Sequence, residues 1–147
     1  MKSLRTIVMA VGVVAAAGLA GCRSAPDQVP YARAFPEIGQ QREVVDIQVF
    51  KRPTKLELVN TTNRAFGAST LWLNQRFSHP IEGLGVGQTL VISLDDFRDE
   101  YSEPFRDESF FATEMPDRLV LAQLETADPG DPSKTTLVGL IVIGKDE

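Results

Sequence analysis

The chain has 147 residues, and its 20 acidic side chains outnumber its 15 basic ones, which gives a formal net charge of −5. Nucleic acids and anionic lipid head groups repel such a chain, so the composition argues against DNA or RNA as partners. The single cysteine excludes an intramolecular disulfide. A hydrophobic core therefore has to hold the fold, and the length is that of one domain.

The first 21 residues have the layout of a secretory signal peptide. Lys2 and Arg5 form a positively charged start, and residues 6–19 are almost entirely small and apolar. This run is too short to span a bilayer comfortably, since a spanning helix needs about 20 apolar residues. Without the two leader cations, the formal charge of the remaining chain falls from −5 to −7.

The leader ends in Leu19-Ala20-Gly21-Cys22, which closely resembles the lipobox of bacterial lipoproteins. The resemblance implies cleavage between Gly21 and Cys22, attachment of diacylglycerol to the Cys22 thiol, and acylation of the new amino terminus by a fatty acid such as palmitate. Two or more acyl chains anchor a protein stably, whereas one gives only marginal binding. The alternative is an ordinary signal peptide with a chance cysteine near its end.

The lipobox resemblance implies a mature protein in the bacterial cell envelope, held to a membrane by the lipid on Cys22. In well-studied Gram-negative bacteria, an acidic residue directly after the cysteine favours retention in the inner membrane. Arg23 is basic, so we expect the outer membrane, with the protein facing the periplasm.

Residues 22–43 are expected to form a tether between the lipid and a folded domain over residues 44–147. Several prolines lie among small and polar residues there, a composition typical of an extended linker. Tyr31 and Phe35 are large for a pure linker. We therefore expect one or both of them to dock on the domain.

From Val44 onward, apolar residues alternate with polar ones, which is the period of a half-buried β-strand. The expected strands are, in chain order, residues 45–49, 56–58, 70–75, 89–94, 118–125 and 135–143. Residues 78–88 are expected to form a loop, with at most a very short edge strand at Ile81.

Two of these strands carry further expectations. Residues 135–143 are apolar on both faces, which predicts a central position in a sheet, and a hairpin across Pro129-Gly130 is expected to pair them with the preceding strand. In the third strand, Leu71 and Leu73 share one face and Trp72 lies on the other. We expect Trp72 to pack in the core or on the sheet face, rather than to bind a ligand from solvent.

Short strands at this spacing, with no helix of more than two turns, predict a single all-β antiparallel sandwich of six or seven strands. Residues 55–62 (KLELVNTT) and 84–93 (LGVGQTLVIS) resemble parts of the immunoglobulin-like and fibronectin-like modules of exported bacterial proteins. The first resembles a strand that ends in an Asn-containing turn, and the second a glycine-containing loop followed by a strand. The resemblance implies an immunoglobulin-like fold used for binding or scaffolding.

The usual signatures of catalysis and of metal binding are missing from the sequence. His79 is the only histidine, whereas nucleophilic catalysis usually needs a histidine beside the nucleophile and zinc needs three or four ligands. Neither Asp95 nor Asp96 starts a stretch with the glycine and glutamate of an EF-hand. An irregular calcium site in this region stays open, but we expect no metal, no cofactor and no enzymatic activity.

Residues 95–111 concentrate acidic and aromatic residues, and the sequence Phe-Arg-Asp-Glu occurs in them twice. The segment is long for a connection in a compact domain. One interpretation is a solvated connection whose phenylalanines close one end of the core. The other is a contact surface for a protein partner, since aromatic residues and arginine are enriched at interfaces. The candidate contact residues are Phe97, Arg98, Tyr101, Phe105 and Arg106.

A short helix is expected where this segment begins. Ser93 and Asp96 are placed to cap it, Phe97 and Tyr101 would share one of its faces, and Pro104 would end it.

Two classes of function remain. We favour a tethered, non-catalytic module for binding or assembly that acts on a protein or an envelope polymer. The alternative is a hydrolase of envelope material that uses loop carboxylates such as Asp95, Asp99 or Glu103. Such an enzyme would need two carboxyl groups about 5 to 9 Å apart across a groove.

Lipidation of Cys22 is directly testable. Mass spectrometry of the mature amino-terminal peptide should show Cys22 as the first residue, carrying diacylglycerol. Globomycin treatment of the native host should make the uncleaved form accumulate. A cleaved protein with an unmodified Cys22 would contradict the prediction.

Overall fold

The computed structural model describes residues 29–37 and 41–144, and within them the fold is all-β, as predicted. Cys22 and the rest of the predicted leader lie outside the described residues. The strands are β1 (Glu43–Lys51), β2 (Lys55–Asn60), β3 (Ser69–Leu73), β4 (Phe77–Ile81), β5 (Thr89–Ser93), β6 (Ala122–Ala127) and β7 (Thr135–Ile143). In the described part of the chain, no helix is long and apolar enough to cross a membrane.

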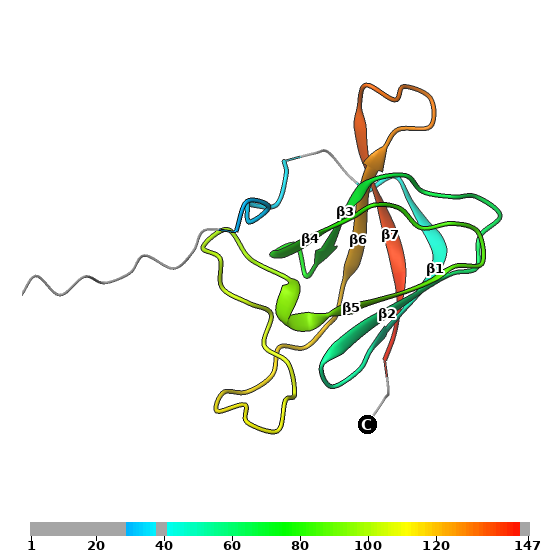
Figure 1. Ribbon diagram of the computed structural model, residues 1–147. Coiled ribbons are helices and arrows are strands. Elements are labelled where there is room, and N and C mark those ends of the chain that lie inside the picture. The colour runs from blue at the N-terminus through cyan, green and yellow to red at the C-terminus, as the bar shows by residue number, and fades with distance from the viewer. Residues whose placement is uncertain (1–28, 38–40, 145–147) are drawn as a thin grey trace, which may run out of the picture.

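The seven strands form one curled sheet in the order β4-β3-β6-β7-β1-β2-β5 (Figure 1). The predicted central position of β7 is confirmed, and so is its hairpin with β6, in which Ala127 pairs with Thr135. All neighbours are antiparallel except β1 and β7, which run parallel. The antiparallel prediction fails at this pair because β1 and β7 are joined by no hairpin: each belongs to a different antiparallel ribbon, and the two ribbons meet here.

The core lies on one face of the curled sheet. Because side chains alternate between the faces of a strand, every second residue of β1, β2 and β3 points into it. Examples are Ile47, Val49, Leu56, Leu58, Leu71 and Leu73, all of which are fully buried. The alternating pattern therefore identified the inward-facing residues of these strands correctly.

β4 differs from the prediction, because residues 77–81 form a full strand rather than loop. A proline within a strand argues against a central position, since it has no N–H to donate. Pro80 is tolerated here because β4 is the last strand of the sheet: its outer side has no strand partner and only a single bridge, between Ser78 and Arg98.

β6 begins at Ala122, four residues later than predicted, because the Asn74 side chain forms hydrogen bonds with the backbone of the residues before it. Its side-chain oxygen accepts hydrogen bonds from the N–H groups of Val120 (3.0 Å) and Leu121 (3.2 Å), and its amide donates to the Arg118 carbonyl (2.7 Å). Asn74 itself lies in the tight β3–β4 turn, with a φ of 53° that asparagine tolerates better than most residues.

Residues 29–37, part of the predicted tether, lie along the face of the sheet opposite the core. The ring of Phe35 packs edge-on against Trp72, with centroids 5.1 Å apart, and the ring of Tyr31 packs against His79. The predicted docking of Tyr31 and Phe35 is therefore confirmed. Trp72 is fully buried and points away from the core residues Leu71 and Leu73, as the alternation predicted.

Asn60 joins the two stretches that resemble immunoglobulin-like modules. Its buried amide donates to the carbonyls of Arg64 (2.9 Å), Leu84 (3.2 Å) and Gly85 (2.9 Å). Its side-chain oxygen accepts from the Thr62 N–H (3.0 Å). One side chain thus satisfies backbone groups of the turn after β2 and of the loop before β5.

We expect Asn60→Ala to lower the free energy of unfolding by about 2 to 4 kcal/mol, because it removes the hydrogen bonds of a fully buried amide and leaves a cavity in its place. Urea unfolding followed by tryptophan fluorescence measures the loss. Asn63→Ala, in the same turn but exposed, is the matched control and should change stability by less than about 0.5 kcal/mol. Equal effects of the two substitutions would contradict this role for Asn60.

Candidate functional site

Residues 94–121, the connection between β5 and β6, form the candidate site. They begin with one 3-10 turn, Leu94–Asp96, and not with the predicted longer helix. Ser93 makes no capping hydrogen bond with its side chain, and the backbone is already extended at Phe97. The helix prediction is therefore wrong: Phe97 is fully buried and Tyr101 is 72% exposed, so the two do not share a face.

Two of the predicted contact residues, Phe97 and Phe105, belong to the core. They are 0% and 1% exposed. The ring of Phe105 packs edge-on against Phe77 of β4, with centroids 5.1 Å apart, and the ring of Phe97 lies beside His79. The prediction of a contact role is corrected for these two side chains, because a buried ring offers no surface to a partner.

Arg98 attaches this segment to the edge of the sheet. Its N–H donates to the Ser78 carbonyl (3.1 Å) and its carbonyl accepts from the Ser78 N–H (2.8 Å). Its guanidinium donates to the backbone carbonyls of Asp95 and Phe97. Arg98 is half-buried, and its side chain bonds only to neighbouring residues, so we infer that Arg98 holds the segment against β4 through its backbone.

Asp99 organises the next turn. One carboxylate oxygen accepts from Arg76 (2.8 and 3.1 Å), and the other accepts from the N–H groups of Tyr101 and Glu103 (both 2.9 Å). Burial raises the pKa of the Asp99 carboxyl, but these hydrogen bonds outweigh the burial and hold the pKa below its ordinary value. Asp99 therefore supports the turn and is poorly placed for proton transfer.

The part of the segment beyond Phe105 is a loop held at its base. The backbones of Arg106 and Asp117 meet through an N–H to carbonyl bond of 3.0 Å, and the Arg106 N–H also donates to the Asp117 carboxylate (3.0 Å). Glu108 donates its N–H to the Pro53 carbonyl (2.7 Å), and its carboxylate pairs with Lys51 (2.5 Å). The loop is thus attached to the β1–β2 hairpin.

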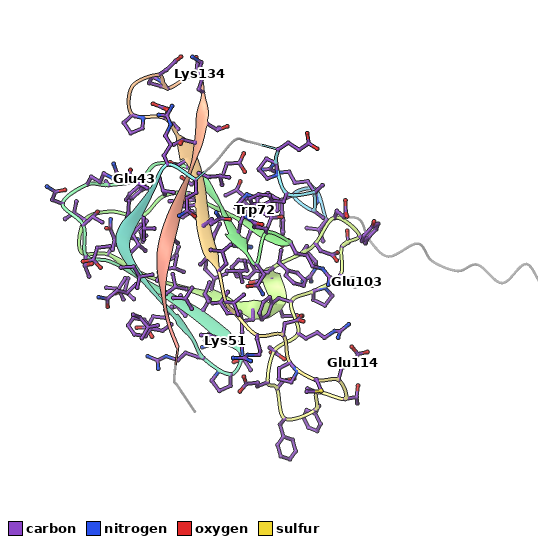
Figure 2. The ribbon with its side chains drawn as sticks, turned by 180° about the vertical axis from the view of Figure 1, so that it is seen from behind. Glu43, Lys51, Trp72, Glu103, Glu114 and Lys134 are labelled. Atoms are coloured by element: carbon purple, nitrogen blue, oxygen red, sulfur yellow. The ribbon has the colours of Figure 1, made fainter. Side chains whose placement is uncertain are left out.

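Three large apolar side chains project from this loop: Phe110, Phe111 and Met115, which are 94%, 88% and 85% exposed. The two phenylalanine rings pack edge-on, with centroids 5.2 Å apart. We call these three residues the apolar tip. Figure 2 shows Glu114 on the same loop, which protrudes from the body of the domain away from Trp72.

A hollow of about 400 Å³ lies beside the base of the loop. Its lining includes Asp95 and Glu103, two of the three carboxylates of the predicted hydrolase alternative. The third, Asp99, is not among the lining residues and is saturated by hydrogen bonds. Among the described residues, no group of three or more histidine, cysteine or acidic side chains is placed to hold a metal ion. The residues that line the hollow are Asp95, Glu103, Pro104, Phe105, Arg106, Asp107, Ser109, Ala112, Thr113 and Glu114.

Of the five predicted contact residues, only Tyr101 and Arg106 are exposed. Arg106 pairs with Glu114 (2.9 Å), which ties it to the loop. The sequence reasoning missed the apolar tip. Phe110 and Phe111 lie within the predicted contact segment but are not among its five predicted contact residues, and Met115 lies beyond it. A pair of adjacent phenylalanines among polar residues, with no strand or helix period, was the available signal.

Acid should weaken the turn at Asp99. Because the pKa of Asp99 is lowered in the folded protein, its stabilisation is present above the unfolded-state pKa of about 3.9 and is lost as pH falls through the folded-state value. We expect Asp99→Asn to cost about 1 to 3 kcal/mol at pH 7 and less at pH 3. Urea unfolding at both pH values measures this; exposed Glu100→Gln is the control. A pH-independent cost would contradict the assignment.

Comparison with protein-family models, with curated proteins and with solved structures found no match to this chain.

Proposed function

We propose that this chain is a lipid-anchored envelope lipoprotein that acts as a non-catalytic module for binding or assembly, and that it contacts a protein partner through the apolar tip. The lipobox resemblance at Leu19–Cys22 supports the anchor and the export. The exposed side chains of Phe110, Phe111 and Met115 carry the proposal for binding.

Leaving three large apolar side chains in water is unfavourable, since each would gain roughly 1.5 to 3 kcal/mol if fully buried. Exposed apolar groups that cluster mark contact sites more often than single ones do. Aromatic residues and methionine are the types enriched at interface cores. The tip combines both types on one protruding loop.

Hydrogen bonds and ion pairs at the base of the loop hold it in place before a partner binds. Bonds of Arg106 to Asp117 and Glu114, and of Glu108 to Pro53 and Lys51, fix both its ends. A partner that buries the tip therefore pays less of the conformational entropy that ordering a free loop would cost.

The loop that carries the tip is rich in acidic residues, two of which, Glu108 and Glu114, are paired with Lys51 and Arg106. Asp107, Glu108, Glu114 and Asp117 lie on the same loop, and the chain as a whole is acidic. This charge opposes approach to anionic lipid, so we favour a protein surface with an apolar recess and a basic rim. Salt should weaken such a complex, because it screens the charges at the rim.

The role of Asp99 in the turn supports binding over hydrolysis. Its hydrogen bonds take up both carboxylate oxygens, which removes it from the set of candidate acids and bases. Asp95 and Glu103 line the hollow together with Asp107 and Glu114, and no histidine is among the described residues that line it.

The double substitution Phe110→Ser with Phe111→Ser tests the proposal. We expect it to remove the partner from pull-downs of native membranes while unfolding free energy changes by less than about 0.5 kcal/mol, because both side chains are exposed. Partner recovery by the unsubstituted protein should fall as salt is raised.

Two controls separate binding from stability. Tyr101→Ala removes an exposed aromatic residue outside the tip and should leave recovery unchanged. Phe97→Ala removes a core ring and should cost about 3 to 5 kcal/mol. Full recovery by the tip variant, or loss only with Tyr101→Ala, would place the contact elsewhere.

A further inference from the structure

Residues 29–37, which we call the strap, cover a surface on the outer face of the sheet. The guanidinium of Arg33 lies 4.8 Å from the centroid of the Trp72 ring and pairs with the Glu125 carboxylate. It also donates to the Thr70 hydroxyl at 3.4 Å. With Phe35 packed edge-on against the same indole, Trp72 is left with no exposed surface.

The strap has a third contact on β4 and the residues that follow β5. The Tyr31 ring lies edge-on to His79, with centroids 5.6 Å apart, and its hydroxyl donates to the Asp96 carbonyl (2.5 Å). The Ser78 hydroxyl donates to the Tyr31 carbonyl (3.2 Å). The three contacting side chains are at positions 31, 33 and 35, and the first of them lies in a turn that the Ala32 N–H closes on the Val29 carbonyl at 2.9 Å.

The strap is held by side chains and not by strand pairing. In the described residues, its one hydrogen bond between backbone groups joins Ala32 to Val29, within the strap itself. It adds no strand to the sheet. Its removal would therefore break no ladder of β-sheet hydrogen bonds.

The surface under the strap is built without it. The Trp72 indole N–H donates to the Glu125 carboxylate at 2.8 Å, and Thr70 lies opposite Glu125 in the pairing of β3 with β6. The strand register thus fixes an indole face, a carboxylate and a hydroxyl side by side. We call Thr70, Trp72, His79 and Glu125 the seat; Figure 2 shows Trp72 on the strands beside residues 29–37.

We propose that the seat is a binding site for a short peptide of the pattern aromatic-x-Arg-x-aromatic, and that the strap is its detachable ligand within the same chain. The carboxylate of Glu125 selects the cation, which lies over the indole ring of Trp72. The second aromatic ring packs edge-on against the same indole, and the first packs edge-on against His79. A peptide of this pattern from outside the chain would compete with the strap for the seat.

Trp72 is the chain's single tryptophan, so its fluorescence reports the seat alone. The experiment uses residues 22–147, which contain every described residue. In the unsubstituted protein, emission should be blue-shifted and resistant to acrylamide. In the double variant Arg33→Ala with Phe35→Ala, emission should shift to the red and acrylamide quenching should rise several-fold, while far-ultraviolet circular dichroism stays unchanged.

A synthetic peptide of residues 29–37 is then added to the double variant. It should restore the blue shift and the protection in a saturable manner, and the same peptide with alanine at both substituted positions should not. Ala34→Ser, at an exposed strap position, is the control that should leave Trp72 protected. If the double variant does not fold, Arg33→Ala alone replaces it with the same measurements.

Two outcomes would overturn the proposal. Unchanged protection of Trp72 in the folded variant would show that the strap does not cover the seat. A folded variant with an exposed Trp72 that the peptide never protects would show a fixed cover with no recognition of the peptide pattern.

Discussion

A curled sheet that buries one face has two edges, and here the core depends on the segment that joins them. β4 and β5 are the outermost strands and do not pair with each other. Residues 94–105 leave β5, bring Phe97 and Phe105 into the core, and pair with β4 through Arg98 and Ser78. The chain must then return to β6, and the loop on that return path projects from the sheet (Figure 1). The three side chains of the apolar tip belong to this loop.

The parts of the fold with strand periodicity could be predicted from the sequence, and the irregular parts could not. Alternation identified the inward-facing residues of β1, β2 and β3 and the outward position of Trp72. β4 was missed because its His79-Pro80 pair is typical of a loop. Phe97 and Phe105 were assigned to a contact surface because charged neighbours conceal burial when the backbone is irregular. Phe110 and Phe111 differ from them in sequence only by being adjacent, and their exposure depends on the course of the loop.

Two buried polar side chains, the amide of Asn60 and the carboxylate of Asp99, have similar structural roles at two turns of this domain. Asn60 satisfies carbonyls after β2, and Asp99 satisfies N–H groups after β5. In each case one side chain replaces the ladder bonds that an irregular backbone lacks. The loops that carry the candidate functions can therefore be long without leaving their buried backbone unsatisfied.

The strap also bears on distance from the membrane in a protein anchored at Cys22. An extended chain reaches roughly 3.3 to 3.6 Å per residue. The stretch from Cys22 to Glu43 can thus reach about 70 Å when nothing holds it, whereas the stretch from Cys22 to Val29 reaches only about 25 Å. Under the proposed anchor at Cys22, a docked strap would keep the start of the domain within about 25 Å of the anchor, and a released strap would let it reach about 70 Å. Docking of the nine-residue strap would therefore determine how far from the anchor the domain can reach.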